Sequence, residues 1–240
     1  MHPSNPDHLP RLFVADDLAI GVPISLPPAQ THYLGRVMRR GVGDAVRLFN
    51  GRDGEMLARL SEVSRNAAIC VPDAVLRAQE PELDLWLAFA PLKREATEMV
   101  VEKATELGAT RLIPVLTARC NSQRINADRW RSIAIGAAEQ SERLSLPNIA
   151  EPVRLAQFLA AWPAERPLIA AIERTSVAPI AGQAGPVGLL IGPEGGFAPD
   201  ELEFIRRHPF VITASLGPRI LRAETAAIVG LALLQACNGG

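Results

Sequence analysis

Apolar and polar positions alternate in two different ways along the chain, and the change near residue 83 indicates two domains. Up to that point, short apolar runs are separated by glycine-rich turns, which is typical of strands in a small β-barrel. Examples of these runs are Arg11–Val14, Ala45–Phe49 and Ala67–Val71. One helix is expected over Pro28–Arg40. We therefore predict a β-barrel over residues 1–74 and a polar linker over residues 75–83.

From residue 84 to residue 240, apolar strands alternate with longer helical stretches. The expected strands are Leu83–Ala90, Arg111–Leu116, Leu168–Ile172, Val187–Ile191 and Val211–Leu216. The expected helices are Lys93–Leu107, Ala127–Arg143, a helix that opens at Pro199, and Arg222–Ala236. Because strands and helices alternate, the pattern predicts an α/β fold in which helices cover both faces of a parallel sheet.

Composition places the chain among ordinary globular proteins, with 48% hydrophobic and 21% charged residues. No apolar run reaches the roughly 20 residues that a membrane span needs. Residues 1–7 lack the basic and apolar segments of a secretory signal. The three cysteines are odd in number and far apart, which favours a reducing compartment, the cytoplasm. Because cysteine and histidine do not cluster, we expect no metal site.

Charge alone does not indicate a nucleic-acid binder, because the net charge is −1. Only Lys93 and Lys103 among the 25 basic residues are lysines, which leaves 23 arginines. The planar guanidinium of arginine suits phosphates and base edges. An arginine-rich genome would give the same composition, so composition permits RNA binding without indicating it.

A glycine-rich loop, Gly192–Gly196, follows the apolar strand that ends at Ile191. In open α/β sheets ligands bind beyond the carboxyl ends of the strands, and glycine lets the backbone approach a ligand closely. The loop has neither the Gly-Lys-Ser/Thr of a phosphate loop nor the spacing of a dinucleotide loop. A ligand is therefore expected here, and an ordinary strand-to-helix turn is the alternative.

A second strand ends in a glycine turn at Gly217, which we expect in a strand adjacent to the first. The segment after it carries Arg219, Arg222 and Glu224 into an apolar helix. Charged groups beside a buried helix are costly unless they are paired or used. A capping acid with solvated arginines is the alternative, but two such turns in one sheet favour a shared binding site.

Together the two motifs closely resemble the RsmE family, which belongs to the SPOUT class of methyltransferases. The likeness extends over nearly the whole chain. Its other parts are His32–Arg39, Phe49–Gly51, Lys93, Glu98, Lys103, Thr105–Gly108 and Glu139–Arg143. One departure is Ala118, where the resemblance leads us to expect an acid before Arg119.

The resemblance implies a SPOUT-type catalytic domain with a C-terminal trefoil knot over residues 84–240, behind a PUA-like, RNA-binding barrel. It also implies the reaction. The chain would transfer a methyl group from S-adenosylmethionine to N3 of a uridine, uridine 1498, in the 16S ribosomal RNA of the small ribosomal subunit. A homodimer is implied as well.

By the same resemblance, three segments hold the cofactor, and backbone groups of the last two contact the adenine and ribose. Their residues are Ile172, Glu173, Ile191, Gly192, Pro193, Glu194, Gly195, Gly196, Leu216, Gly217, Ile220 and Leu221.

The candidate catalytic residues follow from the chemistry of uracil N3, a poor nucleophile until its proton leaves. A base must take the proton, or cations must favour the anionic ring. Arg222 and Arg143 are the candidates to stabilise negative charge on the base or to fix a phosphate. Glu224 either orients these arginines, which we favour, or accepts the proton. No histidine lies in the matching motifs, so the sequence does not identify the proton acceptor.

Four arginines of the first domain are expected to contact ribosomal RNA phosphates: Arg11, Arg36, Arg39 and Arg40. A solvated helix face is the alternative for the last three. Two other functions stay open. One is the same chemistry on another base, or on a ribose 2′-hydroxyl, of ribosomal or transfer RNA. The other is a non-catalytic ribosome-assembly factor, which the two intact glycine loops with Arg222 and Glu224 disfavour.

Overall fold

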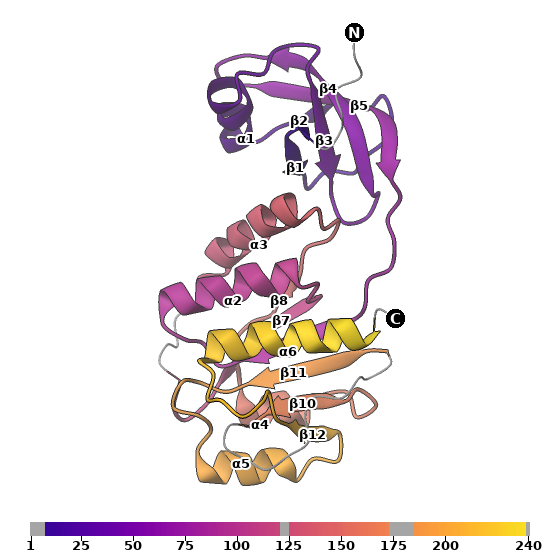
Figure 1. Ribbon diagram of the computed structural model, residues 1–240. Coiled ribbons are helices and arrows are strands. Elements are labelled where there is room, and N and C mark those ends of the chain that lie inside the picture. The colour runs from indigo at the N-terminus through magenta and orange to yellow at the C-terminus, as the bar shows by residue number, and fades with distance from the viewer. Residues whose placement is uncertain (1–7, 121–124, 173–184, 239–240) are drawn as a thin grey trace. The chain divides into compact units, whose positions relative to one another are not determined.

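The computed structural model describes residues 8–120, 125–172 and 185–238. The chain divides into two compact units, and Figure 1 follows it from the indigo N-terminus to the yellow C-terminus. The first unit comprises residues 1–81 and 138–145, and the second comprises residues 82–137 and 146–240. Each unit has its own sheet, and each is described by itself.

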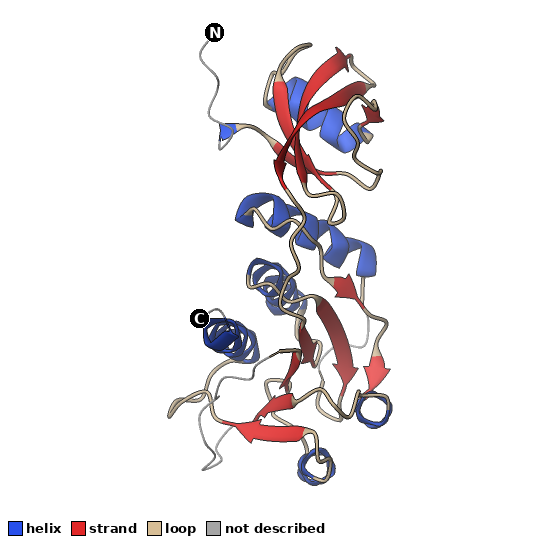
Figure 2. Cartoon of the chain, turned by 90° about the vertical axis from the view of Figure 1, so that its right-hand side faces the viewer, coloured by secondary structure: helices blue, strands red, loops and turns tan. Residues whose placement is uncertain are grey.

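The first unit is built on a five-stranded sheet with strand order β1-β3-β4-β5-β2 (Figure 2). The strands are β1 (Arg11–Phe13), β2 (Ile24–Ser25), β3 (Ala45–Phe49), β4 (Glu55–Val63) and β5 (Ala68–Arg77). Strand β1 pairs with β3 in parallel, and the other pairs are antiparallel. Strand β5 continues through Arg77, into the segment from residue 75 that the sequence suggests as a linker.

The helix expected over Pro28–Arg40 forms as two parts. Helix α1 (Pro28–His32) continues into a π-helical turn, η2 (Tyr33–Val37), where the Met38 N–H donates to the Tyr33 carbonyl at 2.9 Å. Leu34 is fully buried in the core of this unit, whereas Tyr33 and Val37 are exposed. The face of this helical segment that carries Tyr33 and Val37 therefore points to solvent.

The second unit contains a seven-stranded sheet in which every pairing is parallel. Its order is β12-β10-β11-β6-β7-β8, and β9 also pairs with β7. The strands are β6 (Leu85–Phe89), β7 (Arg111–Leu116), β8 (Asn148–Ile149), β9 (Val153–Arg154), β10 (Leu168–Ala171), β11 (Val187–Ile191) and β12 (Val211–Ala214). This confirms the expected α/β fold with a parallel sheet. One detail differs: β10 lies between β11 and β12, so the two glycine turns do not follow adjacent strands.

Helices cover both faces of this sheet, as the alternation predicts (Figure 1). They are α2 (Arg94–Glu106), α3 (Ala127–Ser141), α4 (Leu155–Ala160), α5 (Pro199–Arg206) and α6 (Ala223–Asn238). Leu87 and Leu189 pack with residues of α2 and α6 in one core. The next residues along the strands, Ala88 and Leu190, pack with α4 and α5 in another. Successive strand residues point to opposite faces, so near-continuous apolar strands are needed to bury both.

Helix α6 packs closely on the sheet at Gly230, where an added Cβ would lie 2.6 Å from a methyl carbon of Leu189. This contact lets the middle of α6 lie directly on the middle of β11. The knot implied by the resemblance stays a prediction, because the connection from β10 to β11 includes residues 173–184, outside the described part of the chain.

Candidate functional site

A cavity of about 560 Å³ lies at the carboxyl ends of β10, β11 and β12. Three segments converge on it: the end of β10, the loop after β11, and the stretch from Ser215 to the first turn of α6. Its lining residues are Ala171, Ile172, Ile191, Gly192, Pro193, Glu194, Gly195, Gly196, Phe197, Leu202, Ser215, Leu216, Gly217, Arg219, Ile220, Leu221, Arg222, Ala223 and Ala226. The two glycine turns thus share one cleft, as the sequence predicts.

The loop Gly192–Gly196 needs its glycines for two different reasons. An added Cβ on Gly192 would lie 2.9 Å from the Phe197 ring, which is buried against the loop. Gly196 has a φ of 67°, a left-handed conformation that side chains rarely adopt, and its N–H donates to the Pro193 carbonyl at 2.8 Å. The loop therefore closes on itself and presents mainly backbone to the cleft.

The second turn is held by one side chain. Gly217 has a φ of 114°, and its N–H donates to the Ser215 hydroxyl at 3.2 Å. The apolar residues Leu216, Ile220 and Leu221 lie along the cleft wall. Ile220 is 60% exposed, which is unusual for such a side chain and leaves its apolar surface available to a ligand.

Charged side chains at the rim are mostly cationic. Arg219 and Arg222 are exposed and line the cleft together with Glu194. Among the described residues, neither guanidinium has a hydrogen-bonding or ion-pairing partner, so both can bind an anionic group. Glu224 is partly buried on the first turn of α6 but does not line the cavity.

The cofactor-binding residues expected from sequence come together in this cleft. All of them line it except Glu173, which lies outside the described residues. Five further residues of the lining were not expected to hold the cofactor: Phe197, Leu202, Ser215, Ala223 and Ala226. Ala171 lies in the segment at the end of β10 that the resemblance assigns to the cofactor. Phe197 follows the glycine loop directly, but nothing in the sequence indicates that its ring turns back under Gly192. Arg219 was noted in the second motif without a cofactor role.

Arg143 is not among the residues that line the cleft. It belongs to the first unit, is 9% exposed, and its Nε donates to the Ser145 hydroxyl at 3.2 Å. Its backbone carbonyl accepts from Arg11 at 2.7 Å. These contacts are structural ones, and the catalytic role suggested for Arg143 stays a prediction.

Arg11 requires a correction. The sequence suggested a phosphate contact, but the side chain is 3% exposed, and burial lowers the pKa of its guanidinium. Its three nitrogens donate to the Glu55 carboxylate and to the carbonyls of Ala138 and Arg143, and the guanidinium lies 3.6 Å from the centroid of the Phe49 ring. A side chain so enclosed cannot also contact RNA directly, so its role is to hold residues 138–145 against β1 and β3.

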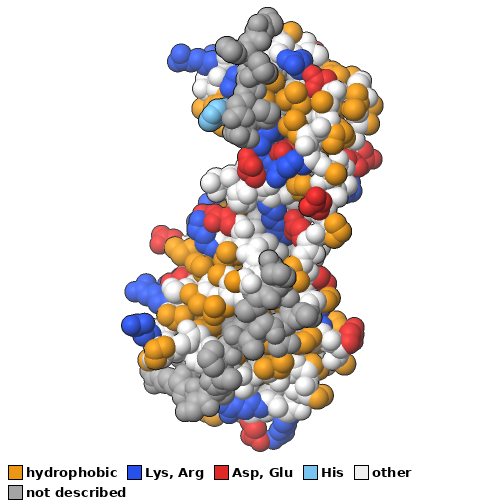
Figure 3. All heavy atoms as spheres, turned by 45° about the vertical axis from the view of Figure 1, so that its right-hand side comes forward, with side chains coloured by type: hydrophobic (Ala, Val, Ile, Leu, Met, Phe, Trp, Pro, Cys, Tyr) orange, Lys and Arg blue, Asp and Glu red, His pale blue; other side chains and the backbone are white. Residues whose placement is uncertain are grey.

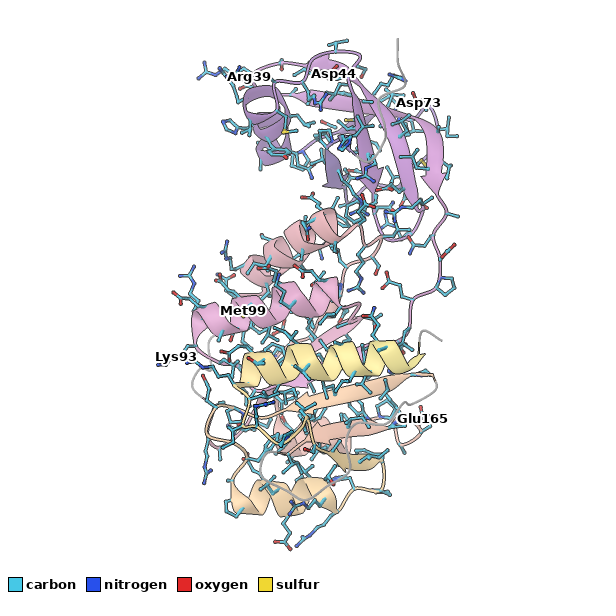
Figure 4. The ribbon with its side chains drawn as sticks, in the orientation of Figure 1. Arg39, Asp44, Asp73, Lys93, Met99 and Glu165 are labelled. Carbon is cyan, nitrogen blue, oxygen red and sulfur yellow. The ribbon has the colours of Figure 1, made fainter. Side chains whose placement is uncertain are left out.

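Arg36 and Arg39, by contrast, are exposed, and Arg40 is partly buried. Arg39 has a φ of 53° and points outward from the first unit beside α1 (Figure 4). Two exposed arginines that follow the exposed Tyr33 within six residues of sequence are compatible with a surface that contacts RNA. On the face drawn in Figure 3, basic and acidic side chains are interspersed, which agrees with the small net charge.

Metal sites and membrane-spanning helices are both absent from the described residues. No cluster of three or more histidine, cysteine, aspartate or glutamate side chains there has the arrangement needed to hold a metal ion. No helix in the same residues has both the length and the apolar character to cross a membrane.

Family models match both parts of the chain. The model described as an RNA methyltransferase domain matches residues 79–235, and the model described as an RNA methyltransferase PUA domain matches residues 26–73. Among curated proteins, the chain is 34% identical to ribosomal RNA small subunit methyltransferase E of Rickettsia conorii, over 94% of each chain. It is 35% identical to the protein of that name from Synechocystis, over 94% of this chain and 77% of the relative.

Two solved structures are similar over nearly the whole chain. One is ribosomal RNA small subunit methyltransferase E of Neisseria gonorrhoeae bound to S-adenosylmethionine, with a TM-score of 0.87 and 27% identity over 96% of this chain and 98% of that one. The other is a Legionella pneumophila protein with S-adenosylmethionine bound, with a TM-score of 0.83 and 32% identity over the same shares.

Proposed function

Since this chain belongs to the ribosomal RNA small subunit methyltransferase E family, we propose that it transfers the methyl group of S-adenosylmethionine to N3 of uridine 1498 in 16S ribosomal RNA. It is an RNA methyltransferase by family. The cofactor, the target atom and the roles of single residues make up the proposal.

The observation that carries the proposal is the cleft between the two glycine turns. Its volume of about 560 Å³ lies within the range of roughly 300–1,000 Å³ that small-molecule sites occupy. Backbone groups of Gly192–Gly196 and Gly217 can hydrogen bond a polar purine and ribose, while Ile172, Leu216 and Ile220 supply apolar walls. Two structural relatives carry S-adenosylmethionine, which supports the same ligand here.

The residues of the chain mainly orient the reactants. S-adenosylmethionine supplies a methyl group already activated by its sulfonium, so alignment is the larger part of catalysis. Glu194 lies at the cleft rim, where a carboxylate favours the positive charges of such a ligand. Arg222, exposed and without a protein partner among the described residues, would stabilise negative charge on uracil oxygens as the N3 proton leaves. The N3–carbon bond would form as the bond from the methyl carbon to the sulfonium sulfur breaks, which leaves a neutral thioether.

Glu224 follows Arg222 by two residues, in the first turn of α6. Both residues lie at the start of α6, and Glu224 does not reach the cavity lining. Since it does not line the cleft, a role as direct proton acceptor is disfavoured. The orienting role of Glu224 stays a prediction from the resemblance, because among the described residues Arg222 forms no ion pair with it. The acceptor for the N3 proton is then solvent or a group of the substrate complex.

In this proposal the first unit binds the ribosomal RNA. Arg36, Arg39 and Arg40 contact phosphates and set the register of the ribosomal RNA, a task that needs no base contact. We further propose that the protein acts as a homodimer in the cytoplasm, where small ribosomal subunits are available.

One experiment separates this proposal from its two alternatives. Purified protein, S-adenosylmethionine with a labelled methyl group, and small ribosomal subunits are mixed, and the modified nucleotide is mapped by mass spectrometry. Label on N3 of uridine 1498 is the expected result. Label on another base or on a ribose 2′-oxygen would show that the methyl group goes to a different atom from the one proposed. Absence of label, with folded protein and unmodified subunits, would favour a non-catalytic assembly factor.

A further inference from the structure

Glu201 contacts two separate segments of the second unit with its one carboxylate. Its Oε2 accepts from the Ala198 N–H at 2.9 Å, at the start of α5. Its Oε1 accepts from the Ala118 N–H at 2.7 Å, in the segment after β7. A carboxylate can accept at both oxygens, and hydrogen bonds to a charged acceptor are stronger than neutral ones.

Arg119, the residue after Ala118, makes a second connection to the same region. Its Nη1 donates to the Gly195 carbonyl at 2.9 Å, inside the glycine loop of the cleft. Its aliphatic carbons flank the same glycine, because a Cβ added to Gly195 would lie 3.6 Å from the Arg119 Cδ. Adjacent residues of the segment after β7 thus hold two points of the turn, Gly195 and Ala198.

A simple helix cap does not account for this arrangement. The bond from Ala198 to Glu201 is half of a capping box, and alanine has no side-chain acceptor to complete it. To cap α5, Glu201 would need only its hydrogen bond from the Ala198 N–H. The second oxygen is used by Ala118, which lies 83 residues earlier in the chain. The connection therefore joins the glycine loop to a different strand end of the sheet.

The arrangement also explains why Ala118 can stand where the resemblance suggested an acid. Its side chain is exposed, and only its backbone N–H takes part in the connection. The link to the loop is therefore independent of the residue type at position 118.

We propose that Glu201 and Arg119 are positioning residues that hold the Gly192–Gly196 loop in the shape that accepts the cofactor. This inference rests on the proposed function for its ligand. Neither residue supplies a reacting group, and Glu201 is not among the residues that line the cleft. If the loop spends only about one tenth of its time in the accepting shape, the apparent dissociation constant rises about tenfold.

The test compares Glu201→Ala, Glu201→Gln and Arg119→Ala with a matched control, Asp200→Ala. Asp200 lies in the same first turn of α5, so its loss weakens the helix dipole interaction without removing a bond to the loop. Glutamine offers one carbonyl oxygen instead of two acceptors, so Glu201→Gln keeps only one of the two bonds. Arg119 is exposed, so its variant is expected to fold.

Two readouts are taken on each protein: S-adenosylmethionine affinity by calorimetry, and backbone hydrogen exchange of residues 192–198 without ligand. We expect Glu201→Ala to bind about tenfold more weakly, Glu201→Gln to fall between, and Asp200→Ala to bind like wild type. In Glu201→Ala the Michaelis constant for the cofactor should rise together with the dissociation constant. The Michaelis constant for the ribosomal substrate should stay unchanged. Loop amides should exchange faster in Glu201→Ala and Arg119→Ala, with exchange in β11 unchanged.

A double variant checks that both residues act on one loop. Combining Glu201→Ala with Arg119→Ala should weaken binding by less than the product of the single effects, because the second loss acts on a loop already released.

Wild-type affinity in the two single alanine variants, with wild-type loop exchange, would overturn the inference and leave the proposed function intact. Failure of wild-type protein to bind S-adenosylmethionine would overturn the proposed function instead. In that case the exchange measurement still decides whether Glu201 and Arg119 order the loop.

Discussion

Two pairs of arginines, one in each unit, have opposite surroundings. In the first unit Arg11 and Arg47 are buried around Glu55, and their hydrogen bonds go to protein groups. At the cleft of the second unit, Arg219 and Arg222 are exposed and, among the described residues, have no protein partner. The same side chain thus stabilises structure in one place and is available to substrate in the other. Burial and partners, rather than residue type, decide between the two roles.

The largest effect is expected at Glu55, the centre of the buried cluster. Its side chain is 1% exposed and pairs with Arg11, Arg47 and Arg77. Glu55→Gln leaves the buried guanidinium of Arg11 without its ion-pair partner, which should cost about 3–5 kcal/mol of unfolding free energy. Hydrogen exchange of β4 and β5 amides measures this. Glu62→Gln, on the exposed side of β4, should change the value by less than about 0.5 kcal/mol. If Glu55→Gln also lowered the unfolding free energy by less than about 0.5 kcal/mol, the cluster would have no structural role.

At the cleft, Arg222→Ala should lower the rate of methyl transfer by about 100-fold or more, because a cation that stabilises developing charge is lost. Cofactor affinity and stability should not change, since the guanidinium has no partner among the described residues. Single-turnover kinetics with small ribosomal subunits measures the rate. Arg206→Ala, an exposed arginine of α5 outside the cleft, is the control. Full activity of Arg222→Ala would remove this residue from the mechanism.

A smaller effect is expected from the pH dependence of the first unit. Burial raises the pKa of Glu139, whose Oε1 accepts from the Phe13 N–H at 3.0 Å. Since the folded pKa is above the unfolded one, the stabilising contribution is complete below the unfolded pKa and is lost as pH rises through the folded pKa. Glu139→Gln keeps the acceptor and removes the charge, so it should stabilise this unit modestly at neutral pH.

Glu142 provides the opposite case. A hydrogen bond from Arg47 lowers its pKa, so its contribution is present above the unfolded pKa and is lost as pH falls through the folded pKa. Glu142→Gln should therefore destabilise at neutral pH and have little effect in acid. Urea unfolding of the two variants between about pH 4 and pH 7 compares them. Shifts of the same sign in both would contradict the assigned surroundings.

The smallest effect is expected on the exposed surface of the first unit. Arg36→Ala and Arg39→Ala should each weaken ribosomal RNA binding modestly and lower the slope of log affinity against log salt by about one. Arg11→Ala should instead destabilise the unit. Filter binding over a salt series measures the slopes. Unchanged slopes for both exposed arginines would remove them from the RNA contact.

The sequence predicted most of the second unit because its signals are local. The strand Arg111–Leu116 has the predicted bounds, and Pro199 opens α5 as expected. Helix α4 was missed because it has only six residues and no side-chain cap. Strand β4 was not singled out either, since register shifts at three points interrupt its alternation of buried and exposed residues.

The site could be predicted only in part, because its remaining features depend on contacts between distant segments. The glycine turns can be recognised in the sequence, but the packing of the Phe197 ring against Gly192 cannot. Nor does the sequence show that Glu201 reaches Ala118, or that Arg11 is enclosed by Glu55 and the carbonyls of residues 138 and 143. Such contacts exist only once the chain has folded.

Calorimetric titration of S-adenosylmethionine into wild type, Gly192→Ala and Gly41→Ala tests the central claim most directly. An added methyl group at Gly192 collides with Phe197, whereas at Gly41 it meets nothing within 4 Å. The cleft account predicts one site in wild type, equal affinity in Gly41→Ala, and binding at least about tenfold weaker in Gly192→Ala, whose loop seldom reaches the accepting shape. Folded wild-type protein that binds no cofactor, or a Gly192→Ala variant that binds as tightly as wild type, would contradict it.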